Sequence, residues 1–550
     1  MDRGDIVRAL LSVWDKTGLA EFAQGLHDLG WELVSTGQTH AALTNAGIPA
    51  ISVADVTGFP EILGGRVKTL HPVIHAGILA RRDVPGDLSA LAEHGIVAIE
   101  LVVTNLYPFV STISGNGAPP VVDGHLSDAI REAVEQIDIG GPAMTRAAAK
   151  NFAHVAVVTD PRDYPGTLDH LRAGTLGVAE RVRLAQAAFS HTAQYDAYVA
   201  AYFSAMAGQK FPDAVSLPLT RASSLTYGEN PHQSAALYRL ADPRLTGPGL
   251  ADLVHLSGDD PSYNNLLDLD CAYAIVADFT GVAVSIVKHN NPCGVGVGSS
   301  PADAYRRAYA GDPLSAFGGV VACNRIVDGD MARAMSGVLY WVLVAPGYTD
   351  EALRILGRRQ TRVFSLPVPS TAGMLSAFDW QYRPVTGGFL AQSHDTINAD
   401  EVTFTAASAR KLTDAEENDL RMAWRIVKHV RSNASVFVRD GAVRAVGAGQ
   451  MSRLDSVVAA TRIASRSAQD ARTSDAALKQ VEGGHVSPLV GSVMATDGFF
   501  ADPDAVEAAC EAGATAIAHP GGGRKDADAS AMADRYGIAL VTTGFRHFRH

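Results

Sequence analysis

Cysteine is scarce in this chain of 550 residues, and its few copies are scattered. The four cysteines are Cys271, Cys293, Cys323 and Cys510, and no two of them form a Cys-x-x-Cys pair. A disulfide framework needs cysteines at regular spacings, and a thiolate zinc site needs them clustered. The cysteine content therefore favours neither.

Long apolar runs and an excess of positive charge are also lacking. The N-terminal stretch MDRGDIVRALLSVWDKTG has no signal-peptide core, and no segment approaches the roughly 18 apolar residues needed to span a bilayer. A net charge of −12 argues against nucleic acid or an anionic membrane as the main partner. Small anionic substrates remain compatible, because a local group of cations can oppose the global sign. We expect a cytoplasmic protein.

The length of the chain indicates at least two domains, since one hydrophobic core does not grow to this size. The segment from Lys210 to Pro218 contains two prolines and shows no hydrophobic periodicity. We therefore predict one domain over 1–210 and a second region over 211–550.

The first 110 residues alternate between strand-like and helix-like segments. The strand candidates are Ile6–Val13, Trp31–Ser35 and Ile99–Thr104. The polar turns that follow them are Asp15-Lys16-Thr17-Gly18, Thr36-Gly37-Gln38-Thr39 and Asn105-Leu106-Tyr107-Pro108. This alternation predicts a parallel α/β domain, whose ligands gather at the carboxyl ends of the strands.

The loop Gly64-Gly65-Arg66-Val67-Lys68-Thr69-Leu70-His71-Pro72 combines two glycines with two cations. Exposed backbone N–H groups beside Lys and Arg can hold a phosphate, although a plain surface loop has the same composition. His71 and His75 are four residues apart, but Pro72 intervenes and no acidic partner follows. We predict no metal site here.

An apolar strand, Val282–Val287, runs directly into Lys288-His289-Asn290-Asn291-Pro292-Cys293-Gly294. A base that titrates near neutrality beside a fixed cation suits proton abstraction coupled to oxyanion stabilisation. Neighbouring strand residues face opposite ways, so Lys288 and His289 share one ligand only where strand geometry breaks. The alternative is a strand end with two solvated side chains.

Pro292-Cys293 after a strand also suggests the zinc nucleobase deaminases. Their signature needs a second cysteine at position 296 and an upstream His-x-Glu motif. Gly296 occupies that position and no such motif precedes the strand, so the metal-dependent interpretation fails on ligand count.

Further along, Thr413–Val430 carries a capping box and an apolar face typical of a helix. Ser435–Val438 and Val443–Val446 flank Asp440-Gly441, a strong signal for a two-residue hairpin.

Taken together, the chain resembles the bifunctional family that combines AICAR (5-aminoimidazole-4-carboxamide ribonucleotide) formyltransferase with IMP cyclohydrolase. The resemblance runs from about Arg8 to His550. Its strings, in order, are SVWDKTG, GRVKTLHP, NLYPF, EQIDIGGPAM, RAAAKN, HTAQYD, YGENPHQ, SYNN, KHNNPCG, DPLSAFGG, GAGQMSR and the terminal RHF.

The resemblance implies a methylglyoxal-synthase-like parallel α/β domain over 1–210 that closes the purine ring. It also implies a duplicated, zinc-free, cytidine-deaminase-like α/β region over 211–550. That region would transfer a formyl group from 10-formyltetrahydrofolate, a co-substrate, to AICAR, with no tightly bound cofactor. The product FAICAR would then be closed to IMP. The family is a homodimer whose transferase sites lie between subunits.

For ring closure, the resemblance makes Lys150 the proton donor and acceptor, with Lys68, Tyr107 and Asp138 holding and polarising the reacting groups. Its nucleotide-binding residues fall on Ser12, Trp14, Asp15, Lys16, Thr36, Gly37, Gln38, Thr39, Arg66, Val67, Thr69, Thr104, Asn105 and Ile139.

For formyl transfer, the resemblance makes His289 the base, Lys288 the oxyanion stabiliser and Asn433 the amide that holds the reacting groups. Its substrate and folate contacts fall on Tyr227, Gly318, Arg453, Phe499, Asp504, Arg524, Lys525 and Arg546.

Three departures affect the transferase half. Thr226 stands where the family has an arginine that grips phosphate, a loss of about 2–4 kcal/mol unless another cation such as Arg221 replaces it. Trp341 stands at an acidic ribose-binding position, and Ala501-Asp502 interrupts an apolar string. Two alternatives stay open: a cyclohydrolase with a weakened or re-targeted transferase, and a non-catalytic purine or folate binding protein.

Overall fold

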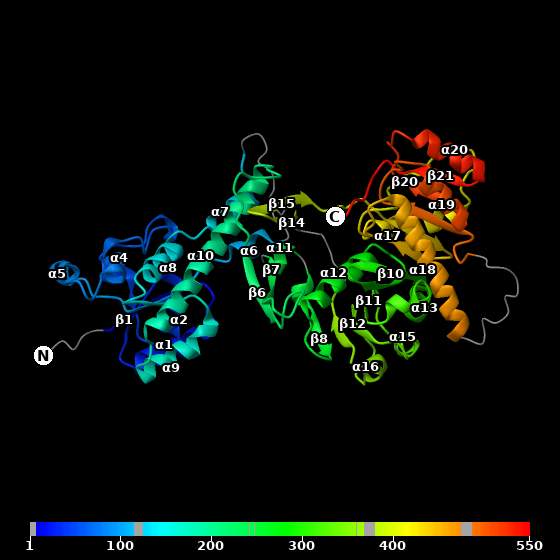
Figure 1. The fold of residues 1–550 in the computed structure, drawn as a ribbon. Helices are drawn as coiled ribbons and strands as arrows, with labels where there is room; N and C mark the ends of the chain where they lie inside the picture. Colours follow the sequence, from blue (N-terminus) through cyan, green and yellow to red (C-terminus); the bar gives the residue numbers. More distant parts are fainter. Residues whose placement is uncertain are drawn as a thin grey trace. The chain divides into compact units, whose positions relative to one another are not determined.

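The computed structural model describes residues 7–114, 125–240, 242–246, 248–358, 360–367, 380–474 and 487–550. The chain forms two compact units, drawn blue to cyan and green to red in Figure 1. The first takes in the described residues of Met1–Thr220, Leu240–Thr246 and Ala372–Trp380, and the second takes in the rest. None of the helices in these ranges combines the length and apolar content required to cross a bilayer.

The first unit is built on a five-stranded parallel sheet of order β3-β2-β1-β4-β5. The strands are β1 (Arg8–Val13), β2 (Glu32–Ser35), β3 (Ile51–Ser52), β4 (Leu101–Asn105) and β5 (Ala156–Val158). The three strands that the sequence predicts are thus present, and the α/β class is confirmed.

Helices cover both faces of this sheet. They are α1 (Leu19–Asp28), α2 (Gly37–Asn45), α3 (Val53–Thr57), α4 (Pro72–Leu79), α5 (Pro85–Glu93), α6 (Phe109–Ile113), α7 (Asp128–Glu135), α8 (Gly140–Lys150), α9 (Tyr164–Ala173) and α10 (Val178–Met206), with short 3-10 turns at Leu63–Gly65 and Pro161–Asp163. Leu10 and Leu11 are both fully buried, each in a different core cluster. Successive residues of a strand face opposite sides, so both faces of β1 are packed.

The second unit contains a twelve-stranded sheet of order β16-β21-β20-β19-β17-β18-β10-β9-β11-β12-β13-β8. Its strands are β8 (Val254–Ser257), β9 (Val282–Lys288), β10 (Asn291–Gly298), β11 (Gly319–Cys323), β12 (Tyr340–Ala345), β13 (Arg362–Ser365), β16 (Thr405–Ala406), β17 (Ser435–Arg439), β18 (Ala442–Gly447), β19 (Ser492–Thr496), β20 (Ala514–His519) and β21 (Ala539–Thr542). Two small sheets pair β6 (Leu219–Leu225) with β7 (Ala235–Leu240) and β14 (Trp380–Val385) with β15 (Gly388–Ser393).

The order of this large sheet repeats about its centre. Outward from the middle run β10-β9-β11-β12-β13 on one side and β18-β17-β19-β20-β21 on the other. In both halves a hairpin is followed by parallel strands, and the Gly296–Ala442 pair joins the halves. The duplication that the resemblance implies is therefore visible in the topology.

The helices of the second unit are α12 (Tyr263–Ala277), α13 (Pro301–Tyr309), α14 (Pro313–Ala316), α15 (Gly329–Ala334), α16 (Asp350–Leu356), α17 (Asp414–Val427), α18 (Arg453–Ser474), α19 (Asp504–Ala512) and α20 (Asp526–Tyr536), with a 3-10 turn at Leu250–Asp252. The short helix α11 (Pro243–Thr246) belongs to the first unit. The Thr413 capping box predicted for α17 is present.

Glycines let a helix pack closely on each hairpin. A Cβ built on Gly294 of β10 would lie 1.9 Å from the carbonyl oxygen of Ala308 in α13. The counterpart in the other half is Gly447 of β18, whose Cβ would lie 1.8 Å from the carbonyl oxygen of Ser456 in α18. Neither carbonyl can move without bending its helix.

We expect Gly294→Ala to lower the free energy of unfolding by about 1–3 kcal/mol, because the added methyl group overpacks backbone against backbone. Denaturant unfolding of the full chain measures the loss. Gly388→Ala is the matched control, since nothing lies within 4 Å of its Cβ position. Equal stability of the two variants would contradict this packing.

Candidate active sites

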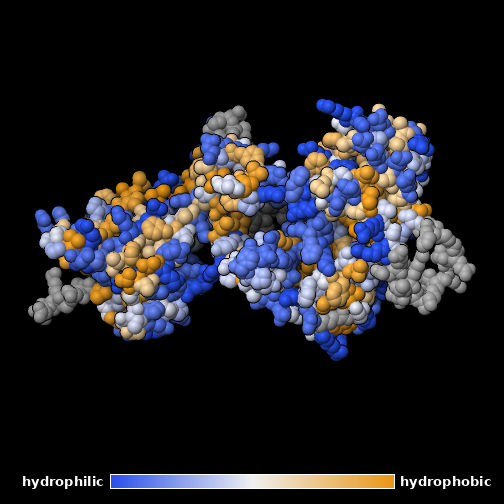
Figure 2. Space-filling view, in the orientation of Figure 1, coloured by the Kyte–Doolittle hydropathy of each residue, from blue (hydrophilic) through white to orange (hydrophobic). Residues whose placement is uncertain are grey.

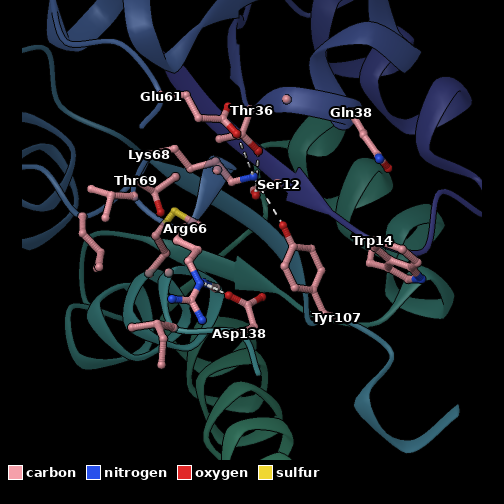
Figure 3. A pocket seen from close by; sticks show the side chains of 18 of the residues that line it. Ser12, Trp14, Thr36, Gln38, Glu61, Arg66, Lys68, Thr69, Tyr107 and Asp138 are labelled. Atoms are coloured by element: carbon pink, nitrogen blue, oxygen red, sulfur yellow. Dashed lines mark hydrogen bonds and ion pairs between the residues drawn. The ribbon is translucent and has the colours of Figure 1, made fainter. Parts of the chain in front are cut away.

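A cavity of about 740 Å³ opens at the carboxyl ends of β1, β2 and β4 (Figure 3). Fourteen residues predicted from the sequence line it: Ser12, Trp14, Thr36, Gly37, Gln38, Thr39, Arg66, Val67, Lys68, Thr69, Asn105, Tyr107, Asp138 and Ile139. The carboxyl-end placement expected for the polar turns is therefore present. Asp15, Lys16, Thr104 and Lys150 are outside this lining.

Hydrogen bonds between neighbouring strand ends hold the floor of this cavity. The Asn105 side-chain oxygen accepts the backbone N–H groups of Trp14 (2.6 Å) and Asp15 (2.8 Å). The hydroxyl oxygens of Ser12 and Thr36 lie 2.9 Å apart. These bonds join the ends of β1, β4 and β2, so the turns keep a common position.

Asp15, Lys16 and Thr104 support these turns from outside the cavity. Asp15 accepts from the backbone and hydroxyl of Thr17, and the hydroxyl bond chiefly holds the pKa of its carboxyl below the usual value. Lys16 donates to the carbonyl oxygen of Trp14 (3.2 Å). Thr104 is fully buried in β4.

A lysine, a tyrosine and a carboxylate form a chain across the cavity (Figure 3). Lys68 Nζ donates to the Tyr107 hydroxyl (3.3 Å) and lies 3.7 Å from Glu61 Oε1. Gly65 leaves room for Glu61, because a Cβ there would lie 2.4 Å from Oε1. Sequence reasoning missed Glu61, and its only signal is its place just before Gly64.

Arg66 extends from the same loop to α7, where its guanidinium pairs with Glu135. The two hydrogen bonds measure 2.9 and 3.2 Å, and both side chains are exposed. A carboxylate thus holds in place a cation that faces the cavity. Glu135 is a second lining residue that the sequence did not predict.

Asp138 lies at the start of α8 and is mostly buried. Its carboxylate accepts the backbone N–H of Gly141 (2.8 Å), and its own N–H donates to the Tyr195 hydroxyl (2.8 Å). Burial raises the pKa of this carboxyl, although the Gly141 bond and the charge of Lys68 oppose the rise. A carboxyl group with a raised pKa beside a lysine can accept or release a proton closer to neutral pH.

Lys150 is separated from this cavity by the length of α8. The first turn of α8 lines the cavity, whereas Lys150 is the last residue of the helix and is exposed. At 1.5 Å of rise per residue, the two ends of an eleven-residue helix are about 15 Å apart. The structure does not bring Lys150 together with Lys68, Tyr107 and Asp138, and its role stays a prediction.

In the second unit, the segment after β9 makes a two-residue hairpin turn. His289 and Asn290 have positive φ values of 54° and 63°. The strand geometry therefore breaks directly after Lys288, as it must if Lys288 and His289 are to share one ligand. Asp268 of α12 accepts the backbone N–H groups of both His289 (3.2 Å) and Asn290 (2.6 Å). Lys288 is half-buried and the His289 side chain is exposed.

Lys288 lies beside two of the residues singled out in the sequence. Its Nζ donates to the carbonyl oxygen of Phe317 (2.7 Å), directly before Gly318. The Trp341 indole nitrogen would lie 3.2 Å from a Cβ on Gly318, and Lys288 Nζ 3.9 Å from it. Trp341, one of the departures, therefore borders the predicted catalytic lysine, and 42% of it is exposed.

Asn433 follows α17 and has a fixed amide orientation. Its oxygen accepts from Arg453 Nη2 (3.0 Å), while its nitrogen donates to the carbonyl oxygens of Gln450 (3.1 Å) and Met451 (3.2 Å). Arg453 is in turn paired with Asp497, which is fully buried.

The structure brings the Lys288–His289 turn close to the segment that precedes Asn433. Asn291 Oδ1 accepts the backbone N–H of Arg431 (3.0 Å). Residues from the two halves of the sheet thus meet at one place, although they are far apart in sequence.

Some of the predicted folate and substrate contacts lie next to Arg453. Arg453 Nε donates to the carbonyl oxygen of Phe499 (3.0 Å), and Phe548, stacked beneath Arg546 at 4.6 Å, lies against Gly498. Lys525 forms an ion pair with Asp502 at 3.1 Å. Asp502 is part of the Ala501-Asp502 departure from the family string, so this departure contributes an ion pair to a predicted folate contact.

The remaining predicted residues are placed by their elements, with no described contact to the Lys288–His289 turn. Asp504 opens α19, Arg524 is an exposed neighbour of Lys525, and Tyr227 follows β6, which also carries the exposed Arg221. Within the described ranges, no group of three or more His, Cys, Asp or Glu side chains is arranged to hold a metal ion.

Comparison with known proteins covers both units. Residues 148–463 match the family model described as AICARFT/IMPCHase bienzyme, and residues 18–143 match the MGS-like domain. A protein named bifunctional purine biosynthesis protein PurH from Chloroflexus aurantiacus is 47% identical over 548 residues, 99% of both chains. Proteins of the same name from Parvibaculum lavamentivorans (45%, 99% of this chain and 97% of the relative) and Neisseria meningitidis (44%, 99% of both) are similar. The solved structure titled "Crystal structure of ForH" is 40% identical, covers 36% of this chain and 98% of that chain, and has a TM-score of 0.32.

The buried carboxyl of Asp138 generates a pH-dependent prediction. Its pKa is raised in the fold, so its ionised form carries a penalty that is present above the folded pKa and disappears below the unfolded value near 4. We expect Asp138→Asn to raise Tm by roughly 1–4 °C at pH 8, with the difference vanishing by about pH 4. Calorimetry of the full chain at several pH values measures this.

Asp15→Asn is the control with the opposite sign, because the Asp15 pKa is lowered. Its stabilisation is present above the unfolded pKa and is lost as pH falls, so this variant should be less stable than wild type at pH 8. A destabilised Asp138→Asn at pH 8 would contradict the assignment of burial as the dominant effect.

Proposed function

Since the chain belongs to the AICARFT/IMPCHase bienzyme family, we propose that it is a bifunctional enzyme of purine biosynthesis. It transfers a formyl group from 10-formyltetrahydrofolate to AICAR and then closes the product FAICAR to IMP. The observations that carry this proposal are the match to the AICARFT/IMPCHase bienzyme model and identity of 44–47% along the full chain to proteins named bifunctional purine biosynthesis protein PurH. No observation favours a weakened transferase or a non-catalytic binding protein.

We place ring closure in the cavity of the first unit. The carboxamide nitrogen attacks the formyl carbon within one molecule, so the enzyme chiefly supplies orientation and proton transfer. Asp138 and Lys68 are the proposed proton-transfer groups: one takes the amide proton and the other protonates the formyl oxygen. The formamide nitrogen gives up its proton as the C–O bond breaks, so the oxygen leaves as water. Tyr107, hydrogen-bonded to Lys68, holds the lysine toward the reacting centre.

The walls of this cavity suit a nucleotide. The first residues of α2 and α8 line it, and helix N-termini favour anions; Arg66 lines it as well. We propose that these groups hold the phosphate and ribose of FAICAR, while Trp14 lies edge-on to Tyr107 at 5.5 Å and borders the base.

We place formyl transfer at the turn after β9. His289 takes a proton from the AICAR amine as its nitrogen bonds to the formyl carbon, and Lys288 stabilises the tetrahedral oxyanion. The bond from carbon to the folate nitrogen then breaks, and His289 returns the proton to that nitrogen. Asn433, oriented by Arg453, holds the reacting groups.

Folate enters as a co-substrate and leaves as tetrahydrofolate, so no tightly bound cofactor is part of the proposal. Phe499, Arg453 and the Arg524–Lys525 pair are its proposed contacts. Tyr227, Gly318, Asp504 and Arg546 are assigned to the substrates, with Trp341 at the rim beside Lys288.

Two variants test the division of labour between the units. We expect His289→Ala to reduce formyl transfer by about 10²–10⁴-fold and leave ring closure unchanged, because a general base is lost at one site only. Lys68→Met should show the reverse pattern. Steady-state assays of each half-reaction on the same preparations give both numbers. Unchanged formyl transfer in His289→Ala would reject the assignment.

We also propose that the protein works as a cytoplasmic homodimer with transferase sites between subunits. Support for a dimer comes from the first unit, whose surface shows apolar areas in Figure 2. Its exposed apolar side chains include Val178, Phe189 and Phe203 of α10. Light scattering should give twice the 57.8 kDa of one chain. Dilution below the dimer dissociation constant should lower transferase specific activity and spare ring closure. A monomer with full transferase activity would contradict the proposal.

A further inference from the structure

The proposed transferase site depends on two segments that no covalent link keeps together. One is the turn Lys288–Asn291 in the first half of the large sheet, and the other is His429–Asn433 in the second half. The hydrogen bond from the Arg431 N–H to Asn291 is a direct connection between them (3.0 Å). One hydrogen bond from a backbone N–H to a side-chain oxygen leaves the two segments free to pivot, so further contacts must set their relative position.

The C-terminal segment supplies such contacts through the backbone of Arg549. Its N–H donates to the Ser432 hydroxyl (3.3 Å), and its carbonyl oxygen accepts the Ser432 N–H (3.1 Å). This reciprocal pair fixes the residue directly before Asn433. Nearby, the His547 N–H donates to the carbonyl oxygen of Asp497 (3.0 Å), so the segment is also anchored on the N-terminal side of the Arg549 contact.

The guanidinium of Arg549 reaches across to the first half. Nη1 donates to the carbonyl oxygen of His429 (2.6 Å), and Nη2 lies 3.4 Å from the side-chain oxygen of Asn290, next to His289. Nη1 also lies 3.6 Å from the sulfur of Cys271, which is buried in α12. The same helix carries Asp268, which accepts the N–H groups of the His289 turn. One planar side chain therefore contacts both catalytic segments.

The surrounding charges indicate that simple ion pairing does not explain this placement. Among the described residues, no carboxylate lies within ion-pair distance of Arg549. Arg431 is a neighbouring like charge, and its pKa is lowered first by burial and then by the charge of Arg549. The guanidinium is held by carbonyl and amide oxygens of the two segments.

We propose that Arg549 is a positioning residue for formyl transfer, which sets the His289 turn against Asn433. The inference rests on the proposed roles of His289 and Asn433. An arginine suits this task because its donors diverge from a rigid plane, whereas a lysine offers one point charge. Since a displacement of 1 Å can cost about 10²-fold in rate, loss of the side chain should lower turnover more than substrate affinity.

We expect Arg549→Ala in the full-length protein to lower kcat for formyl transfer by about 10–100-fold, with KM values for AICAR and 10-formyltetrahydrofolate within about threefold of wild type. Ring closure by the same preparation should be unchanged. Millimolar guanidinium ion should restore at least part of the lost kcat. Arg535→Ala is the matched control, because Arg535 is exposed on α20 and pairs only loosely with Glu507 (3.9 Å); it should show neither the loss nor the rescue.

The result that overturns the inference is wild-type kcat in Arg549→Ala, or a loss that appears in KM alone or equally in both activities. If Arg549→Ala does not fold, Arg549→Lys decides the question: a loss of at least about fivefold in kcat supports positioning, and an unchanged kcat rejects it. Wild-type protein lacking formyl transfer altogether would instead reject the proposed function, so the two failures are distinguishable.

Discussion

A carboxylate that accepts two consecutive backbone N–H groups supports the proposed transferase chemistry. Asp268 holds His289 and Asn290 in left-handed conformations that non-glycine residues rarely adopt. This turn directs the histidine away from the strand, while Lys288 stays half-buried against the Phe317 carbonyl. Without the turn, the two side chains would face opposite sides of a sheet.

The other half of the sheet contains an equivalent turn that lacks the proposed catalytic side chains. Asp419 of α17 accepts the N–H groups of Asp440 (2.8 Å) and Gly441 (2.9 Å), which also have positive φ values. The turn there carries Asp-Gly in place of His-Asn. Duplication thus produced two equivalent hairpins, and only the first carries the imidazole and the amide. The second half contributes instead through Asn433, Arg453 and Asp497.

The two units build their sites by different physical means. In the first unit, parallel strands end at one edge, so the polar turns of β1, β2 and β4 converge there by the topology of the sheet. In the second, the site requires elements from both halves of the repeat and from the C-terminal segment. Contacts between segments that are distant in sequence, such as those of Arg549, therefore position more of the residues of the second site than of the first.

The family resemblance implied individual lining residues of the first cavity, such as Ser12 and Asp138. Local patterns in the sequence were enough to predict the parallel α/β class, the strand before Lys288, the Asp440-Gly441 hairpin and the polar turns around that cavity. Those features follow from periodicity and turn chemistry over a few residues. Glu61 and Glu135 were missed because their proximity to Lys68 and Arg66 arises only when loops fold over the cavity. Lys150 shows the converse, since a string that matches the family places it on α8 but the length of the helix separates it from the cavity. The meeting of Asn291 with Arg431, and of both segments with Arg549, depends on strand order in the sheet, which no short stretch of sequence encodes.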